Sequence, residues 1–437
     1  MKYDRFFELA KAAGIEEAEL SISNSYSLSF SLFHGEIDSY TTSNSTSYIA
    51  RGIYKGKMGS VVSDVYNKDI AKYFVDKIVS IASVIENDDP VFIFKGSEKY
   101  KKINTFNKQL STISIEKKIE VAKDIEKKIK SGDPRIVEVE TVAYDESSSS
   151  YTIINSHGLK LVQKNNYFIY YGGAMAKENG QTKTGGDLYF GNDYSKFDAD
   201  ELVKSIIKDT VDQLGGFPCD TSTYKAVLSP DVVKAFLSAY VSSAIAEDVQ
   251  KNSSLFIGKL GQKVASKKVT VEDLPLAKTV FARSFDDEGV ATYNKPIIKN
   301  GILQTYLYNL TTAAKEGVQT TANGGTGGDT NPWFLKMKAG KKTQDQLFEE
   351  IGNGVYITSV QGLHAGLNPR SGNFSLQSTG YFVENGKRTH GLDIITVSGN
   401  LVDLFNSIVE VGNDSKQFIN GIECPSVIIK KIAVSGK

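Results

Sequence analysis

The chain reads SSLFIGKLGQKVAS at residues 253–266, FDDEGVAT at residues 285–292 and IIKNGIL at residues 297–303. The third segment predicts a tight β-hairpin, because Asn300 and Gly301 tolerate the positive φ angles of a type I′ turn and apolar residues flank them. The first segment is a glycine-punctuated loop and the second is an acidic turn. Together they predict that the second half of the chain is rich in β-structure.

The length of the chain predicts either two domains or one large interleaved body. With 437 residues, the chain is longer than a single hydrophobic core usually serves. Gly215-Gly216-Phe217-Pro218 interrupts a helical pattern and favours a domain boundary at that point. We predict an α+β fold with large mixed or antiparallel β-sheets and flanking helices. Residues 1–218 would form an N-terminal α+β domain and residues 219–437 a β-rich C-terminal domain.

Hydrophobic periodicity indicates where the helices and strands lie. Apolar residues recur at helical spacing in residues 4–13, 67–85, 115–130, 198–214 and 229–248. Short runs of apolar and β-branched residues predict strands at residues 20–32, 47–54, 59–63, 136–143, 151–155, 160–175, 181–190 and 224–228. Turns are expected at His34-Gly35, Lys55-Gly56, Asp145-Glu146-Ser147, His157-Gly158 and Asn179-Gly180, and a flexible loop at residues 324–329. The first half should therefore contain antiparallel strands.

Charge and cysteine content argue against several classes of protein. The chain has 51 basic and 51 acidic residues, which removes the bulk attraction expected of a general nucleic-acid binder or a membrane-surface protein. Charged residues interrupt the apolar ones at the N-terminus, so we expect neither a signal peptide nor a membrane span and predict a cytoplasmic protein. Cys219 and Cys424 lie far apart and predict free thiols rather than a disulfide framework.

The histidines do not form a metal-binding motif. A zinc peptidase usually takes two imidazoles from one element, together with a carboxylate that accepts a proton from the metal-bound water. No two of the four histidines, His34, His157, His364 and His390, lie within one or two helical turns of each other. The sequence therefore predicts no zinc ligand set of this kind in the chain.

Two groups of polar residues allow a chemical and a structural interpretation. Asp286, Asp287 and Glu288 could form a cation site or an acid–base pair, but acidic residues before a glycine more often fix a turn by accepting backbone N–H groups. His364 could bind a metal with distant partners, or its ring could satisfy backbone groups in a glycine-rich segment. In both cases we favour the structural role.

Several motifs in a fixed order resemble those of the TldD/PmbA family of peptidase proteins. They are the loop at residues 258–266, the acidic turn at 286–289, the turn at 300–301, and the segments VQGLHAGLNP (360–369), SGNFS (371–375) and TVSGNL (396–401). Weaker similarity in the first half extends the resemblance over most of the chain.

The details of the resemblance favour one branch of that family. The TldD branch carries an HExxxH helix shortly before the glycine loop and a cysteine near the C-terminus, which together bind zinc. The positions of the two histidines correspond to Leu237 and Ser242 here, and neither side chain binds zinc. The cysteine position falls near residues 412–414, whereas Cys424 lies further along. The chain therefore resembles the metal-free TldE/PmbA branch.

The resemblance implies a subunit without catalytic residues or a cofactor of its own. It would join a zinc-bearing TldD-like partner, or a second copy of itself, in a dimeric peptidase with an internal chamber that degrades flexible or unfolded peptides. The residues expected at the peptide channel or the interface are Gly258, Lys259, Gln262, Asp286, Asp287, Glu288, His364, Asn368, Ser371 and Asn373.

Two alternatives remain open. The family's older description as a modulator of DNA gyrase suggests a regulatory module that binds another protein without proteolysis, and zero net charge favours protein over DNA as the partner. A peptidase with a nonstandard metal site would have to recruit its ligands from His364, Asp286, Asp287 and Cys424. Metal analysis of the purified protein would test the second alternative.

Overall fold

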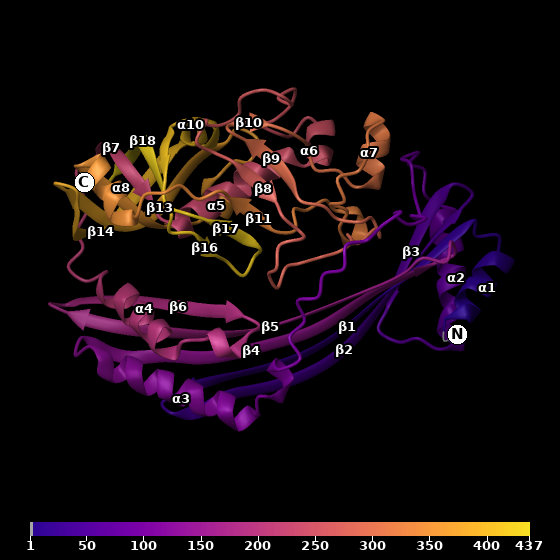
Figure 1. The fold of residues 1–437 in the computed structure, drawn as a ribbon, viewed down its shortest axis with the longest axis horizontal. Helices are drawn as coiled ribbons and strands as arrows, with labels where there is room; N and C mark the ends of the chain where they lie inside the picture. Colours follow the sequence, from indigo (N-terminus) through magenta and orange to yellow (C-terminus); the bar gives the residue numbers. More distant parts are fainter. Residues whose placement is uncertain (1–2) are drawn as a thin grey trace.

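Six strands of the N-terminal half form one curved antiparallel sheet (Figure 1). The computed structural model describes residues 3–437. In spatial order the sheet consists of β3 (Lys57–Ser63), β2 (Glu36–Tyr54), β1 (Glu17–Phe33), β4 (Ile136–Asn155), β5 (Lys160–Glu178) and β6 (Gln181–Gly191). The turns predicted at His34-Gly35, Lys55-Gly56, His157-Gly158 and Asn179-Gly180 connect successive strands, as expected.

Four helices pack against one face of this sheet. They are α1 (Asp4–Ala12), α2 (Lys68–Ala82), α3 (Ile115–Gly132) and α4 (Ala199–Val211). Alternate residues of β1, among them Leu28 and Phe30, point into the core beneath α3 and α4 and are fully buried. Side-chain caps fix where the helices begin: the Ser114 hydroxyl accepts the N–H of Lys117 at 3.2 Å, which starts α3.

The predicted turn at residues 145–147 is wrong, because β4 continues through it. Glu146 points toward the helices, where its Oε2 lies 2.6 Å from Nζ of Lys118 on α3 and accepts the Tyr144 hydroxyl at 2.6 Å. The serines that follow pair with β1 across the sheet, Ser147 with Ser27 and Ser149 with Ser25. A polar run that resembles a turn in the sequence is therefore held in a strand by a buried ion pair and by its neighbours.

Residues 83–109 form a long connection with no regular structure between α2 and a 3-10 turn at Leu110–Thr112. The segment is held by side-chain hydrogen bonds to distant elements. Nδ2 of Asn155 donates to the carbonyl of Phe94 at 2.7 Å, and the Tyr100 hydroxyl donates to the carbonyl of Gly289 at 2.8 Å. This connection therefore touches both halves of the chain.

The C-terminal half contains two further sheets. The first has the order β14 (Lys387–Asn400), β13 (Asn373–Glu384), β12 (Gly354–Gln361), β7 (Ser222–Leu228), β18 (Val427–Ser435) and β15 (Ile408–Val411). Because β14 also pairs with β18, five of these strands close on themselves. The second has the order β10 (Ile302–Leu303), β9 (Lys295–Lys299), β8 (Val271–Asp273), β11 (Leu335–Met337), β17 (Ile422–Cys424) and β16 (Lys416–Gln417).

Short helices complete the C-terminal half. They are α5 (Pro230–Val241), α6 (Ala246–Gln250), α7 (Leu310–Glu316), α8 (Gln344–Ile351), α9 (Leu363–Gly366) and α10 (Leu401–Asn406). The single helix predicted over residues 229–248 is interrupted, because Ile245 is extended and its neighbours bond to Leu307. The N–H of Ala246 donates to the Leu307 carbonyl at 2.9 Å, and the N–H of Leu307 to the Ala244 carbonyl at 2.7 Å.

The predicted hairpin at Asn300-Gly301 is confirmed. Both residues have positive φ angles, 48° and 80°, and β9 and β10 flank them. The α+β class with large antiparallel and mixed sheets is confirmed as well. Within residues 3–437, no helix combines the length and the apolar character needed to cross a membrane.

Candidate functional site

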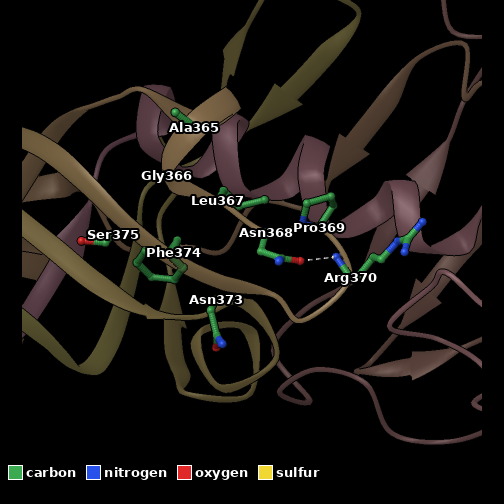
Figure 2. A pocket seen from close by; sticks show the side chains of 9 residues that line it. All are labelled: Ala365, Gly366, Leu367, Asn368, Pro369, Arg370, Asn373, Phe374 and Ser375. Carbon is green, nitrogen blue, oxygen red and sulfur yellow. Dashed lines mark hydrogen bonds between the residues drawn. The ribbon is translucent and has the colours of Figure 1, made fainter.

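A pocket of about 550 Å³ lies where β13 begins, and it coincides with one of the predicted motifs (Figure 2). Its lining residues are Ala365, Gly366, Leu367, Asn368, Pro369, Arg370, Asn373, Phe374 and Ser375. Along the start of β13 the side chains alternate: Asn373 and Ser375 are exposed, whereas Phe374 is buried. The pocket is therefore bordered by amide and hydroxyl groups over an apolar base.

The loop at the mouth of the pocket is shaped by asparagines. Oδ1 of Asn368 accepts the backbone N–H groups of Arg370 and Ser371 at 3.0 and 3.1 Å. Nδ2 of Asn400 donates to the Ser371 carbonyl at 2.8 Å and to Oδ1 of Asn373 at 2.9 Å. These bonds fix the backbone, so the exposed side chains of the loop are presented in a defined arrangement.

His364 does not have the structural role that the sequence favours. It lies on the four-residue helix α9, its side chain is exposed, and no residue of the described chain hydrogen-bonds to its ring. The interpretation that the ring satisfies backbone groups is therefore wrong. The structure places His364 next to Ala365 at the edge of the pocket, where a second molecule could reach it.

The glycine loop lies near this pocket. A Cβ atom placed on Gly372 would be 3.3 Å from Cδ1 of Leu255, so the beginning of the loop borders the segment at the pocket mouth. Nε2 of Gln262 donates to the Gly258 carbonyl at 2.8 Å, and this bond folds the loop onto itself. Lys259 is exposed, as are all residues from 257 to 263, whereas Phe256, Val264 and Ala265 anchor the two ends of the loop in the core. The structure thus brings the glycine loop and the segments at residues 360–369 and 371–375 together.

The acidic turn at residues 286–289 does not line this pocket. The side chain of Asp286 instead fixes the local backbone. Oδ1 of Asp286 accepts the N–H groups of Glu288 and Val290 at 3.0 and 2.9 Å, and Oδ2 accepts the N–H of Gly324 at 3.0 Å. The structural interpretation of Asp286 is confirmed. The loop predicted at residues 324–329 wraps around this turn, and Gly324 is required there, because a Cβ atom would lie 2.2 Å from Oε2 of Glu288.

The acidic turn joins the two halves of the molecule. The Tyr151 hydroxyl, on β4, reaches the Asp287 carbonyl at 3.5 Å, and Tyr100 binds Gly289 from the irregular connection. Nε2 of Gln163, on β5, donates to the Ala282 carbonyl at 3.1 Å just before the turn. Asp287 itself forms an ion pair with Arg283. These contacts attach the C-terminal half to the N-terminal sheet.

Burial changes the acidity of the turn's carboxyl groups. Burial and the neighbouring Glu288 raise the pKa of Asp286 to about 8, although three backbone N–H groups oppose the shift. Burial raises the pKa of Glu288 to about 7, and the N–H of Leu310 opposes this second shift. The buried ion pair between Glu19 and Arg51 lies close enough to act on Glu288. Sequence reasoning missed this pair, because no local pattern connects β1 and β2 to residue 288.

The positions that correspond to zinc ligands do not fit a zinc ion. Leu237 is fully buried in the core around α5, and the Ser242 hydroxyl donates to the Ala239 carbonyl at 2.8 Å. The thiol of Cys424 is also buried, lies 3.3 Å from the Pro230 carbonyl, and has a pKa that burial raises. Within residues 3–437, no three His, Cys, Asp or Glu side chains are grouped as a metal site would require.

Family models match most of the chain. The PmbA/TldA metallopeptidase domain 1 matches residues 18–85, the central domain matches residues 108–214, and the C-terminal domain matches residues 221–436. The chain is also 27% identical over 389 residues to a metalloprotease PmbA homolog of Buchnera aphidicola, an alignment that covers 87% of this chain and 84% of the relative.

Solved structures show the same architecture. A candidate modulator of a DNA gyrase from Thermotoga maritima has a TM-score of 0.92 and 31% identity, and the match covers 99% of each chain. TldE from Thermococcus kodakarensis has a TM-score of 0.90 over 100% of each chain, and at 20% identity it shows that the fold is shared. From the matching models and the alignment over nearly its whole length, the chain belongs to the PmbA/TldD family.

Proposed function

We propose that this chain is a metal-free TldE/PmbA-type subunit that joins a zinc-bearing TldD-like partner to cleave flexible peptides. The observation that carries this proposal is the packing at the zinc-ligand positions. Leu237 contributes to the hydrophobic core and Ser242 bonds to its own helix, so these two side chains stabilise α5 and do not coordinate a metal. In this proposal hydrolysis occurs at the partner's zinc.

In this proposal, this chain contributes a peptide-binding pocket at the start of β13. Asn373 and Ser375 offer amide and hydroxyl groups to a peptide backbone, and Phe374 provides an apolar base. The volume of about 550 Å³ lies in the range of ordinary ligand pockets. The nearby loop exposes Ile257 and Leu260, which are 43% and 51% accessible, and these give apolar contacts to a peptide or a partner chain. The substrate is thus a flexible segment with both apolar and polar side chains.

Two further features belong to the proposal. We place the protein in the cytoplasm, because Cys219 and Cys424 are free and unpaired thiols and such thiols persist in reducing compartments. We also propose a domain boundary between residues 218 and 219. It is supported by the sheets, since the last strand of the N-terminal sheet ends at Gly191 and the next strand begins at Ser222.

The test combines this chain with a TldD-like subunit and follows the cleavage of an unstructured peptide with and without a chelator. Cleavage should require both chains and should stop when the chelator is added. Arg370→Ala, at the pocket, should raise KM several-fold with little change in kcat. The substitution removes a contact to bound peptide but no group that takes part in the hydrolysis. Arg5→Ala, an exposed arginine on α1, is the matched control.

Two results would contradict the proposal. Cleavage by this chain alone in the presence of chelator would mean that it carries its own catalytic groups. Failure to assemble with a TldD-like subunit, together with direct binding to DNA gyrase, would favour the regulatory alternative.

A further inference from the structure

Two segments that border the pocket contain basic residues and no acidic residue. Residues 249–271, which include the glycine loop, contain five lysines and no Asp or Glu. Residues 351–383, which include the lining of the pocket, contain His364 and Arg370 as their basic residues and again no Asp or Glu. The chain as a whole has a net charge of zero, so this excess of positive charge is local.

The helix α10 connects the two segments. The N–H of Leu401, at its start, donates to the Gly372 carbonyl at 2.8 Å beside the pocket. At its other end, Nδ2 of Asn406 donates to the Val264 carbonyl at 3.3 Å, where the glycine loop returns to the core. The side chain of Leu255, at the start of that loop, also lies next to Gly372. The basic groups of the two segments therefore belong to one part of the molecule.

Three basic groups on the exposed loop and at the pocket mouth have no acidic partner. Lys259, Lys263 and Arg370 are exposed, and within residues 3–437 none of them forms an ion pair with a carboxylate. Figure 2 shows the Arg370 side chain extending outward from the loop at the pocket mouth. Lys251 and Lys268, outside the exposed part of the glycine loop, each pair with a glutamate. The three unpaired cations are therefore available to an anionic group of another molecule.

The exposed apolar residues of the glycine loop favour a peptide as that molecule. Ile257 and Leu260 are exposed on either side of Lys259 in the sequence. Single-stranded nucleic acids are usually bound by exposed aromatic side chains on which the bases stack, whereas Phe256 of the loop and Phe374 of the pocket are buried. Cations next to exposed aliphatic groups complement a peptide that has both acidic and apolar side chains.

We propose that the glycine loop and the pocket select peptides that carry acidic side chains beside apolar ones. Lys259, Lys263 and Arg370 set this preference, and the exposed carboxylate of Asp403 on α10 opposes it. The inference rests on the proposed function in one respect, which is the assignment of the pocket to peptide binding. It adds the charge of the peptide, and binding to the isolated chain measures that preference without a catalytic partner.

The test compares three labelled, unstructured peptides that differ only in carrying glutamate, glutamine or lysine at the same positions between leucines. Fluorescence anisotropy measures their binding to the purified chain. Exposed ion pairs are individually weak, so three of them together should make the glutamate peptide bind about tenfold more tightly than the glutamine peptide. The lysine peptide should bind most weakly. Added salt should weaken binding of the glutamate peptide and leave that of the glutamine peptide nearly unchanged.

Two triple variants assign the preference to the named residues. Lys259→Gln, Lys263→Gln and Arg370→Gln together should reduce the affinity for the glutamate peptide to that for the glutamine peptide, and the affinity for the glutamine peptide should not change. Substituting glutamate at the same three positions should reverse the preference, so that the lysine peptide binds more tightly than the glutamate peptide. A reversed preference separates the role of charge from misfolding, because a misfolded chain loses binding of all three peptides.

The matched control removes three exposed lysines from the N-terminal half. Lys11→Gln, Lys68→Gln and Lys123→Gln, on α1, α2 and α3, change the net charge by the same amount and should leave binding of all three peptides as in the wild type. An equal loss of binding in this control would overturn the inference, because the effect would then follow from net charge alone.

Other results separate this inference from the proposed function. Equal affinities for the glutamate and glutamine peptides would overturn the inference, while cleavage of both peptides by the complex with a TldD-like subunit would leave the proposed function intact. If the complex cleaves neither peptide, the proposed function fails. A single-stranded oligonucleotide that displaces the glutamate peptide and binds more tightly at the same salt concentration would assign this surface to nucleic acid and also overturn the inference.

Discussion

Asp286 and Glu288 hold their carboxyl groups where water hardly reaches them, and their protonation is therefore coupled to folding. Their ordinary pKa values are 3.8 and 4.5, and in the folded protein the values rise to about 8 and about 7. The folded protein thus holds these protons more tightly than the unfolded chain does. The contribution of these groups to stability is largest below pH 4 and is lost as the pH rises toward 8.

Glu288→Gln should weaken this pH dependence. Glutamine keeps an oxygen for the N–H of Leu310, which lies 2.8 Å from Oε2 of Glu288, but it cannot ionise. Between pH 5 and pH 8.5 the free energy of unfolding of the wild-type protein should fall by about 2 kcal/mol more than that of the variant. Denaturant titrations at the two pH values measure the difference. Glu120→Gln, a solvent-exposed change on α3, should follow the wild type.

At the scale of single helices, strands and turns, the sequence predicts those features that depend only on residues close together in the chain. The helices predicted to begin near residues 115 and 229 do begin there, as α3 and α5, each with a serine cap, and the Asn300-Gly301 pair forms its predicted turn, because each signal acts within a few residues. The features that the sequence did not predict depend on tertiary contacts. The continuity of β4 depends on Lys118, which approaches from α3, and the end of α5 depends on bonds to Leu307. Neither partner is visible in the local sequence.

The hairpin turn provides a test at this scale. Gly301 has a φ of 80°, and a Cβ atom there would lie 2.3 Å from the Ala265 carbonyl and 2.7 Å from that of Ser266. Gly301→Val combines backbone strain with a clash against the glycine loop and should destabilise the protein by about 2 to 4 kcal/mol. Thermal unfolding monitored by circular dichroism measures the loss.

Gly180 offers a control in an equivalent turn. Its φ is 79°, but nothing lies within 4 Å of the position of its Cβ atom. Gly180→Val should therefore cost only the backbone strain, about 1 to 2 kcal/mol. Equal losses of stability in the two variants would mean that the close contact between the hairpin and residues 265–266 does not add to the cost of the Gly301 substitution.

At the scale of the whole molecule, the sequence motifs indicated the family but not the arrangement of the motifs. The glycine loop and the segment at residues 364–373 come together near one pocket, whereas the acidic turn joins the N-terminal sheet to the C-terminal half. The ion pair of Glu19 and Arg51 influences the pKa of Glu288 in this turn, although both residues lie more than 200 positions earlier in the chain. Only the folded chain brings such groups together, so the sequence could not separate residues at the pocket from residues that connect the two halves of the chain.

The four histidines lead to a prediction about metal content that depends on the whole fold. His34 pairs with Glu138 at 3.1 Å, His157 with Glu17 at 3.3 Å and His390 with Glu384 at 3.8 Å, each in a different part of the molecule, while His364 is exposed. Each described imidazole therefore has at most one carboxylate beside it, and a structural or catalytic zinc ion needs three or four ligands. After dialysis, the purified chain should contain well below one zinc ion per molecule by elemental analysis.

A TldD-like subunit purified and dialysed in the same way is the control, and it should retain about one zinc ion per chain if its HExxxH helix binds the metal. Adding zinc to the present chain should not raise its melting temperature, because a ligand stabilises a protein only when it binds the folded state more tightly than the unfolded one. Stoichiometric zinc that survives dialysis, or a zinc-dependent rise in melting temperature, would show that distant side chains converge on a metal. In that case the pocket beside His364 would be the first place to look for the ion.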